Sequence, residues 1–458
     1  MKYIGVDLGS SYVKAVLLDL DQRRILQKDK MPSPARKLDL EPNYYEIPAG
    51  KFVDIVKKMI DGYTKKYLDI DGVIISTQMH GFIYQTKERE DIYISWQDMR
   101  CMNFMPEEKC SYLEWMESKI SQEEMRNNGV YLKPSLAVCN LFTLLETNHQ
   151  LPKTGKLYTI GSYIIHALTG SYVCHISNAA PLGIADVVDN RWDKTLLEKL
   201  NLEGIQLPEL VKNDYEVCGE YVSNGYRLKV FPDYGDMQVS ILGSGIGKGE
   251  VVVNVATGAQ VIRYDKKFVP GAYEIRPYFD KSYLYTISNM PSGRNLDVLI
   301  KFLQESIYRI IGKRPDIQDI WHIIHEEKLT GDPNLTVETS FYKNPYFKNG
   351  GAIKGITHSN LHLNTLFYAA FYDMATTYWH FIKELGAEEK DISRIVCAGG
   401  VNWKTPEIRM MLRDVTGKRC ELSPIADEAF YGMFLLSLLC SGQCRSIAEA
   451  KAFKIEGE

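Results

Sequence analysis

Two short loops, one near the start of the chain and one just past its midpoint, combine glycine with hydroxyl residues. The first contains Gly9, Ser10 and Ser11, and the second contains Thr257 and Gly258. Each lies between two apolar, β-branched runs and is explained on its own as the tight turn of a β-hairpin, for which glycine is favoured. Such turns also point successive backbone N–H groups outward and form a concave site for phosphate oxygens. Together the two loops predict a site that holds a polyphosphate from both sides.

Two aspartates accompany these loops. Asp7 ends the first predicted strand, where it is placed to hold Mg²⁺ through water, since hard cations prefer oxygen ligands. Asp236 follows a stretch rich in turn residues, and there it can accept the proton of an attacking hydroxyl during phosphoryl transfer. An alternative is that Asp236 caps a helix, because Asp is favoured at that position and the residues after it continue as a helical pattern. Both roles are compatible.

A set of polar and aromatic residues follows two other predicted strands. Carboxylate, guanidinium and amide groups pair with hydroxyls, while an indole ring covers the apolar face of a sugar. A polyhydroxylated substrate is therefore predicted at the ends of these strands. For His80, a structural role is the alternative to acid–base chemistry. The residues of this set are Gln78, Met79, His80, Trp96, Asp98 and Arg100.

A third glycine turn, Gly399-Gly400, connects a predicted strand to a predicted helix. Small residues at such a turn let an adenine ring lie against the backbone, and Asn402 is placed to hydrogen-bond to the base or to ribose. Strand-to-helix glycine turns are common, so a purely structural role stays open at this point.

The elements that must position these residues alternate between strand and helix, which predicts an α/β fold. Each half of the chain opens with a strand–turn–strand unit, and this internal echo predicts two related domains that face a ligand cleft. Proline and glycine punctuate residues 205–235, which places the boundary there, with domains 1–232 and 233–458. The predicted elements are strands 3–7, 13–19, 72–76, 251–255, 260–264 and 395–397, and helices 51–65, 363–385, 406–415 and one from about 427.

Composition, charge and the cysteine pattern indicate which classes of protein are compatible with the chain. The chain has 458 residues, of which 45% are hydrophobic and 24% charged, as in soluble proteins of two domains. A net charge of −4 indicates neither nucleic acid nor anionic membrane as a partner. Without an apparent signal peptide or a long apolar run, a cytoplasmic location is expected. The nine cysteines are odd in number and lack C-x-x-C pairs, so neither disulfides nor a zinc site is expected. A homodimer is compatible with the sequence, which does not decide the oligomeric state.

Taken in order, these motifs resemble the FGGY family of carbohydrate kinases. The resemblance implies two actin-like, ribonuclease-H-like domains that close over ATP and a sugar. It implies that Asp236 is the general base and that Asp7 and Asp236 are associated with Mg²⁺. It also implies that Gly9, Ser10, Ser11, Lys14, Thr257 and Gly258 contact phosphates, that Gly399, Gly400 and Asn402 contact adenosine, and that the Gln78–His80 and Trp96–Arg100 segments line the sugar site.

Within the family, the segments 95–101 and 235–238 are most similar to the sedoheptulose kinase branch, whereas xylulokinases are similar at 78–81. Three residues depart from the family pattern. Ser10 replaces a frequent threonine, and His175 stands where an aspartate is frequent. Ala256 replaces a glycine, which would strain the second phosphate loop by about 1–2 kcal/mol if that position required a positive φ.

The sequence thus predicts a kinase that phosphorylates a terminal hydroxyl of a ketose, with sedoheptulose preferred and xylulose or another ketose or polyol as alternatives. A different class of function is a catalytically silent protein that binds sugar or nucleotide on the same scaffold. A third is an actin-like ATPase that acts on protein partners, in which Trp96, Asp98 and Arg100 would have no purpose.

Overall fold

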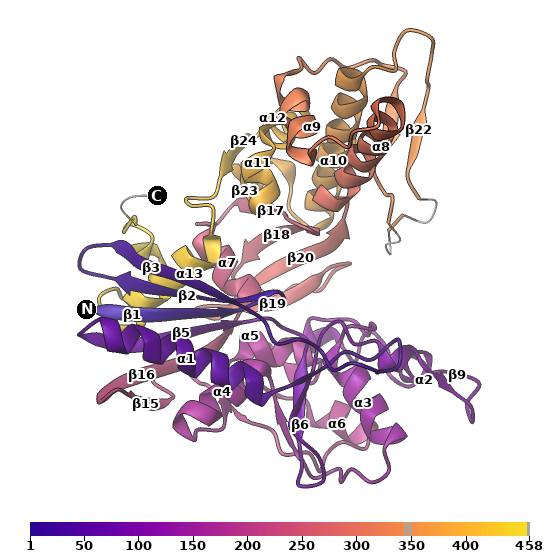
Figure 1. Ribbon diagram of the computed structural model, residues 1–458. Coiled ribbons are helices and arrows are strands. Elements are labelled where there is room, and N and C mark those ends of the chain that lie inside the picture. The colour runs from indigo at the N-terminus through magenta and orange to yellow at the C-terminus, as the bar shows by residue number, and fades with distance from the viewer. Residues whose placement is uncertain (343–345, 348–349, 456–458) are drawn as a thin grey trace.

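The computed structural model describes residues 1–342, 346–347 and 350–455, which form two six-stranded sheets with helices between and around them (Figure 1). The first sheet has the order β15-β16-β5-β1-β2-β3, and the second has the order β19-β20-β18-β17-β23-β24. The strands of the first are β1 (Lys2–Leu8), β2 (Tyr12–Asp19), β3 (Arg24–Pro32), β5 (Ile70–Thr77), β15 (Gly219–Ser223) and β16 (Tyr226–Gly235). Those of the second are β17 (Glu250–Val255), β18 (Ala259–Asp265), β19 (Glu274–Tyr278), β20 (Ser282–Met290), β23 (Arg394–Ala398) and β24 (Arg419–Leu422).

The two sheets repeat one topology. In the first, β1 pairs antiparallel with β2 and parallel with β5. In the second, β17 pairs antiparallel with β18 and parallel with β23. The predicted α/β class and the internal echo of the two halves are therefore confirmed. The predicted boundary at residue 232 falls inside β16, which continues in the first sheet to Gly235.

Two helices lie between the sheets. They are α7 (Asp236–Gly243) and α13 (Glu428–Cys440). Helix α13 is buried almost all round, as a helix that is apolar on every side must be. Its residues share one apolar core with Tyr3 and Ile74 of the first sheet and with Val252 and Val396 of the second. The C-terminal part of the chain thus returns to the first sheet, and both sheets are held on a common core.

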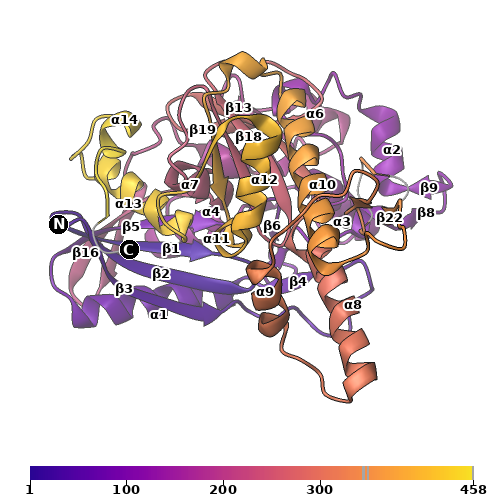
Figure 2. The ribbon, with the colours of Figure 1, turned by 90° about the horizontal axis from the view of Figure 1, so that it is seen from above.

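The outer face of each sheet is covered by amphipathic helices (Figures 1 and 2). Helices α1 and α4 cover the first sheet, and α8, α9, α10 and α12 cover the second. Their bounds are α1 (Gly50–Lys66), α4 (Ile160–Thr169), α8 (Gly293–Ile311), α9 (Ile317–Glu326), α10 (Leu363–Glu384) and α12 (Pro406–Thr416). The helices predicted at 51–65, 363–385, 406–415 and from about 427 are confirmed.

A smaller four-stranded sheet of order β10-β6-β7-β4 carries the predicted sugar-site segments. Its strands are β4 (Glu46–Pro48), β6 (Phe82–Gln85), β7 (Ile92–Ile94) and β10 (Lys156–Tyr158). Short elements around it and elsewhere are β8 (Phe104–Met105), β9 (Cys110–Ser111), β11 (Val173–Cys174), β12 (Ala185–Asp186), β13 (Arg191–Trp192), β14 (Glu209–Leu210), β21 (Thr336–Glu338), β22 (Ala352–Lys354), α2 (Tyr112–Lys119), α3 (Ala137–Thr147), α5 (Ile176–Ala179), α6 (Lys194–Lys199), α11 (Gly400–Lys404) and α14 (Ile447–Ala450). In the described ranges, no helix has both the length and the apolarity to span a membrane.

Candidate active site

Parallel pairing brings the predicted catalytic residues to one edge of the first sheet. Strands β1, β5 and β16 run parallel, with Asp7 opposite Ser76 and Gly235 opposite Thr77. The carboxyl ends of these strands therefore carry Asp7, the segment after β5 that begins at Gln78, and Asp236, the first residue of α7. This end of a parallel arrangement is where α/β folds bind ligands. Gly235, rather than Asp236, is the N-cap of the helix.

Burial and neighbouring charge raise the pKa of both carboxylates. Burial, followed by the charge of Asp7, raises the pKa of Asp236 to about 7. Burial also raises the pKa of Asp7, against the opposing effects of Lys14 and of the Ser76 hydroxyl, which donates to Asp7 Oδ1 at 2.9 Å. The N–H of Met237 donates to Asp236 Oδ1 at 2.8 Å. A carboxylate with a pKa near neutrality is suited to accept a proton at physiological pH.

A hydrogen-bonded chain holds the start of α7 in place. The backbone N–H of Gly235 donates to Ser177 Oγ at 2.9 Å, and Ser177 Oγ lies 2.6 Å from His175 Nδ1. His175 Nε2 lies 3.1 Å from Asp214 Oδ1, so Nε2 carries the proton and Nδ1 accepts from the serine hydroxyl. His175 and Ser177 are each 1% exposed. The family departure at His175 thus serves to orient the residue that precedes Asp236.

Replacing Ser177 with alanine is expected to lower turnover by about tenfold or more, because a small displacement of Asp236 misaligns the proton acceptor. The buried Gly235 N–H would also lose its acceptor, at a cost of about 1–3 kcal/mol in the free energy of unfolding. Steady-state kinetics and urea unfolding measure both effects. The matched control is Ser171→Ala, whose hydroxyl donates to the Cys218 carbonyl elsewhere in the fold. Equal loss of turnover in both variants would remove the positioning role.

Several buried polar atoms near Asp236 have no hydrogen-bond partner among the described residues. Because buried polar groups are nearly always paired, such a cluster marks a ligand site. Met79 packs closely against Gly235, since a Cβ added at Gly235 would lie 2.7 Å from Met79 Sδ. Gln238 Nε2 donates to the Pro277 carbonyl at 3.0 Å, and this hydrogen bond connects the cluster to β19. The unpaired atoms are Gln78 Oε1, His80 Nδ1, Tyr93 Oη, Gln238 Oε1, Arg276 Nε and Arg276 Nη1.

The other residues predicted to contact the sugar differ in their exposure and in their hydrogen-bond partners. Trp96 is 38% exposed. Asp98 is fully buried, and its two oxygens accept from Arg100 at 2.8 Å and from the Tyr45 N–H at 2.7 Å. Arg100 is also buried and pairs with Glu46 at 2.8 Å. Direct sugar contact was expected of Asp98 and Arg100, but both oxygens of Asp98 and the Nε and Nη2 groups of Arg100 are occupied within the fold. These contacts hold the segment that bears Trp96.

Both predicted phosphate turns are hairpin tips. Ser10 and Ser11 are exposed between β1 and β2, and Lys14 Nζ lies 3.3 Å from Asp427 Oδ2 at the start of α13. The second turn connects β17 to β18, and the Ser292 hydroxyl donates to the Thr257 carbonyl at 2.5 Å. Ala256 does not have a positive φ. The strain considered for this position therefore does not arise.

The glycine turn after β23 has a structural requirement of its own. Gly399 has a φ of 84°, and a Cβ there would lie 2.5 Å from the Val255 carbonyl oxygen. Asn402 is fully buried, and its amide donates to the carbonyls of Val253 at 2.9 Å and Ala398 at 2.7 Å. Its N–H groups are therefore committed to the fold, whereas Asn402 Oδ1 is buried without a partner among the described residues. The contact of Asn402 with adenosine stays a prediction. Around Gly400 a Cβ would meet nothing within 4 Å.

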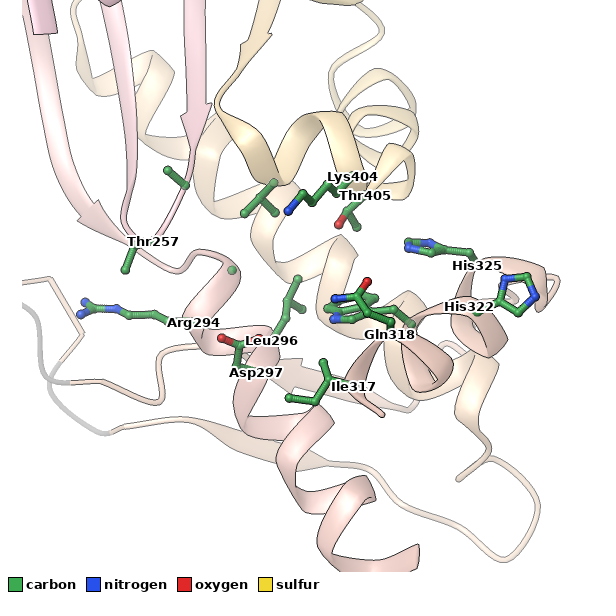
Figure 3. A pocket seen from close by; sticks show the side chains of 14 residues that line it. Thr257, Arg294, Leu296, Asp297, Ile317, Gln318, His322, His325, Lys404 and Thr405 are labelled. Carbon is green, nitrogen blue, oxygen red and sulfur yellow. The ribbon is translucent and has the colours of Figure 1, made fainter. Parts of the chain in front are cut away.

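A pocket of about 710 Å³ lies beside the second phosphate turn (Figure 3). It lies between the Ala256–Thr257 turn, the first turn of α8, helix α9 and the end of α11. Trp321 stacks on His325 with ring centroids 5.5 Å apart. The sequence analysis did not predict that α8 and α9 line a pocket. The segment Ser292-Gly293-Arg294, which begins two residues after β20, could have indicated it. Residues that line the pocket include Thr257, Arg294, Gln318, Trp321, Lys404 and Thr405.

Residues 2–230 match the model of the FGGY family of carbohydrate kinases, N-terminal domain. A rhamnulokinase of Ligilactobacillus salivarius is 27% identical over 218 residues, which are 46% of this chain and 41% of that protein. A sedoheptulokinase of Mus musculus is 21% identical over 343 residues, which are 66% of this chain and 68% of that protein. The matches to the rhamnulokinase, to a glycerol kinase and to a xylulose kinase span 41%, 50% and 54% of those relatives, about half their length.

The crystal structure of xylulose kinase from Rhodospirillum rubrum has a TM-score of 0.84 at 15% identity, and the match covers all of this chain and 93% of that one. The crystal structure of ligand-bound xylulose kinase from Lactobacillus acidophilus has a TM-score of 0.83 at 19% identity, covering 99% and 92%. The two-domain, actin-like fold implied by the resemblance is therefore confirmed. Because the family model matches half of the sequence, the chain belongs to the FGGY family of carbohydrate kinases.

Proposed function

We propose that this protein transfers the γ-phosphoryl group of ATP to a terminal hydroxyl of a ketose. The observation that carries the proposal is the meeting, at one sheet edge, of Asp236 with a pKa near 7 and a group of buried polar atoms without partners. Asp236 takes the proton of the hydroxyl as the hydroxyl oxygen bonds to the γ-phosphorus, and the bond from that phosphorus to the bridging oxygen breaks to release ADP. The backbone N–H groups of the two hairpin turns stabilise charge on the transferring group.

The residues present fit a divalent cation. The charge of Asp7 disfavours the ionisation of Asp236, and the charge of Asp427 disfavours that of Asp7. A hard cation held by the oxygens of Asp7 and Asp236 and by water would relieve this repulsion. When bound, Mg²⁺ neutralises charge on the phosphates. No group of three or more acidic, histidine or cysteine ligands occurs within the described residues, so two carboxylates are the protein's contribution in this proposal.

The pocket bounded by α8, α9 and α11 is proposed to hold adenosine, with the Thr257–Gly258 turn on its phosphates. Residues 1–232 then carry the first phosphate turn and the Gln78–His80 and Trp96–Arg100 segments of the sugar site, and residues 233–458 carry the nucleotide and Asp236. Among ketoses, sedoheptulose is preferred because of segments 95–101 and 235–238, with support from the similarity to the mouse sedoheptulokinase. Xylulose is the second candidate, since solved structures named xylulose kinase match nearly the whole chain.

Truncating Trp321 to alanine is expected to raise the KM for ATP about tenfold, since base–aromatic contacts contribute about 1–3 kcal/mol. The KM for the sugar should stay the same, because Trp321 lines only the proposed nucleotide pocket. Initial-rate kinetics with either substrate varied measure both constants. Trp379→Ala on α10 is the matched control, and it should leave the KM for ATP as it is. An unchanged KM for ATP in the Trp321 variant would place adenosine elsewhere.

The function itself is tested by ADP release coupled to a reporter enzyme, with Mg-ATP and sedoheptulose, xylulose, ribulose, fructose or glycerol, and a control without sugar. Release that depends on one ketose supports the proposal and identifies the substrate. ATP turnover without sugar would support the ATPase alternative. Binding of ATP and sugar with no release would support the catalytically silent alternative.

A further inference from the structure

Arg276 is a buried cation that joins the two halves of the site. It lies in β19 of the second sheet and is 3% exposed. Its Nη2 lies 2.5 Å from Glu274 Oε2 and 3.1 Å from His80 Nε2, which belongs to the segment after β5 of the first sheet. Its Nε and Nη1 have no partner within the ranges that the structure describes. A guanidinium group that is this deeply buried and half used is arranged to receive a ligand.

The contact with Arg276 sets the protonation of His80. A guanidinium group only donates hydrogen bonds, so His80 Nε2 is the acceptor and the ring proton lies on Nδ1. Burial, with the charges of Arg276 and Lys133, holds the pKa of His80 well below its usual value, so the ring is neutral. Its Nδ1 is also buried without a partner. The adjacent groups left for a ligand are therefore donors only.

The local charge favours an electron-rich ligand atom. Glu274 is 14% exposed and forms ion pairs with both Arg276 and Lys133, so two cations share one carboxylate. The nearby Gln78 and Gln238 each leave a side-chain oxygen unpaired, and Gln238 is tied to the Pro277 carbonyl next to Arg276. The site thus offers acceptors for hydroxyls on one part of the ligand and donors with a surplus positive charge on another.

We propose that the substrate presents a carbonyl-type oxygen, keto or carboxylate, to Arg276 and His80, and that Arg276 determines specificity for it. Such an oxygen accepts two hydrogen bonds and has no proton to place. A hydroxyl that accepts the same two bonds still needs an acceptor for its own proton, and neither Arg276 nor His80 supplies one. The inference rests on the proposed function in that the site holds the sugar. The keto group of an open-chain ketose and the carboxylate of an aldonate share this chemistry.

Isothermal titration calorimetry without nucleotide tests the proposal with xylulose, xylitol and xylonate, and with sedoheptulose and the heptitols made from it by reduction. The proteins are the parent chain, Arg276→Met, Arg276→Lys and the control Arg263→Met. Arg263 lies in the same sheet and pairs with Asp265 at 2.5 Å. Arg276→Lys keeps a cation for Glu274 and so protects the fold, but it lacks the planar set of donors.

The parent chain is expected to bind a carbonyl compound about 100-fold more tightly than the matched alditol. Both Arg276 variants should lose this preference through weaker binding of the carbonyl compound, with the alditol unchanged, and Arg263→Met should keep it. Stronger binding of xylulose or sedoheptulose identifies the keto group, and stronger binding of xylonate identifies the carboxylate.

Equal binding of alditols and carbonyl compounds by the parent chain, or binding of none of them, would overturn the proposal. A preference retained by both Arg276 variants would also overturn it. The proposed kinase function fails separately: a preserved binding preference without sugar-dependent ADP release removes the catalysis and leaves the role of Arg276. Sugar-dependent ADP release without a binding preference supports the kinase function and removes the proposed role of Arg276.

Discussion

Asp236→Asn is expected to lower turnover by at least about 100-fold, the scale of general-base catalysis. Asparagine keeps the size of the side chain and an oxygen that can accept from the Met237 N–H, but it cannot take a proton. Binding of sugar should therefore stay within a few-fold of the parent value. Steady-state kinetics and calorimetry measure the two quantities, and Asp265→Asn, which only removes the ion pair to Arg263, is the matched control.

The stability of the same variant provides a second readout in Mg²⁺-free buffer. The native pKa of Asp236 is about 7, above the usual value of 3.8, so the native state holds this proton more tightly than the unfolded state does. The parent chain therefore loses stability as pH rises from about 4 to 7, and asparagine should not show this loss. Asp236→Asn should unfold at a higher temperature than the parent at pH 8, with a smaller difference at pH 5. Turnover within a few-fold of the parent would remove Asp236 from the role of base.

Gly432→Ala is expected to destabilise the protein by about 3 kcal/mol, at the upper end for overpacking. Helices α7 and α13 approach closely at Gly243 and Gly432. A Cβ at Gly432 would overlap the carbonyl oxygen of Val239, a backbone atom that cannot move without shifting α7. Because α7 begins with Asp236, turnover should fall as well. Urea unfolding with an unchanged m-value and initial rates measure the two effects.

Gly62→Ala is the matched control for this prediction. Gly62 lies in the middle of α1, where an added Cβ would meet nothing within 4 Å. The substitution should stabilise the protein by about 0.5–1 kcal/mol, because alanine favours the helix and restricts the unfolded chain. A Gly432 variant as stable as the parent would show that the two helices can separate at little cost.

Local sequence patterns predicted the central strands of both six-stranded sheets and several of the helices that cover them. The apolar spacing over 51–65 predicted α1, and the strand runs on either side of each glycine loop predicted both hairpins. Asp7 was identified from its place at the end of a predicted strand, and Asp236 from its place just after the predicted domain boundary. These features depend on residues that are close in sequence, so the sequence contains the whole of the relevant signal.

Contacts between distant segments decided the rest. Arg276 meets His80 across 196 positions of sequence, and α13 packs between the sheets although it lies near the C-terminal end. The sequence alone did not reveal that Asp98 and Arg100 pair with each other, or that the N–H groups of Asn402 donate to two carbonyls while its Oδ1 is left unpaired. Residue type and spacing determined which chemical groups stand at strand ends. Only the tertiary structure decided which of those groups are left unpaired for a ligand, because pairing depends on side chains that come together only when the chain folds.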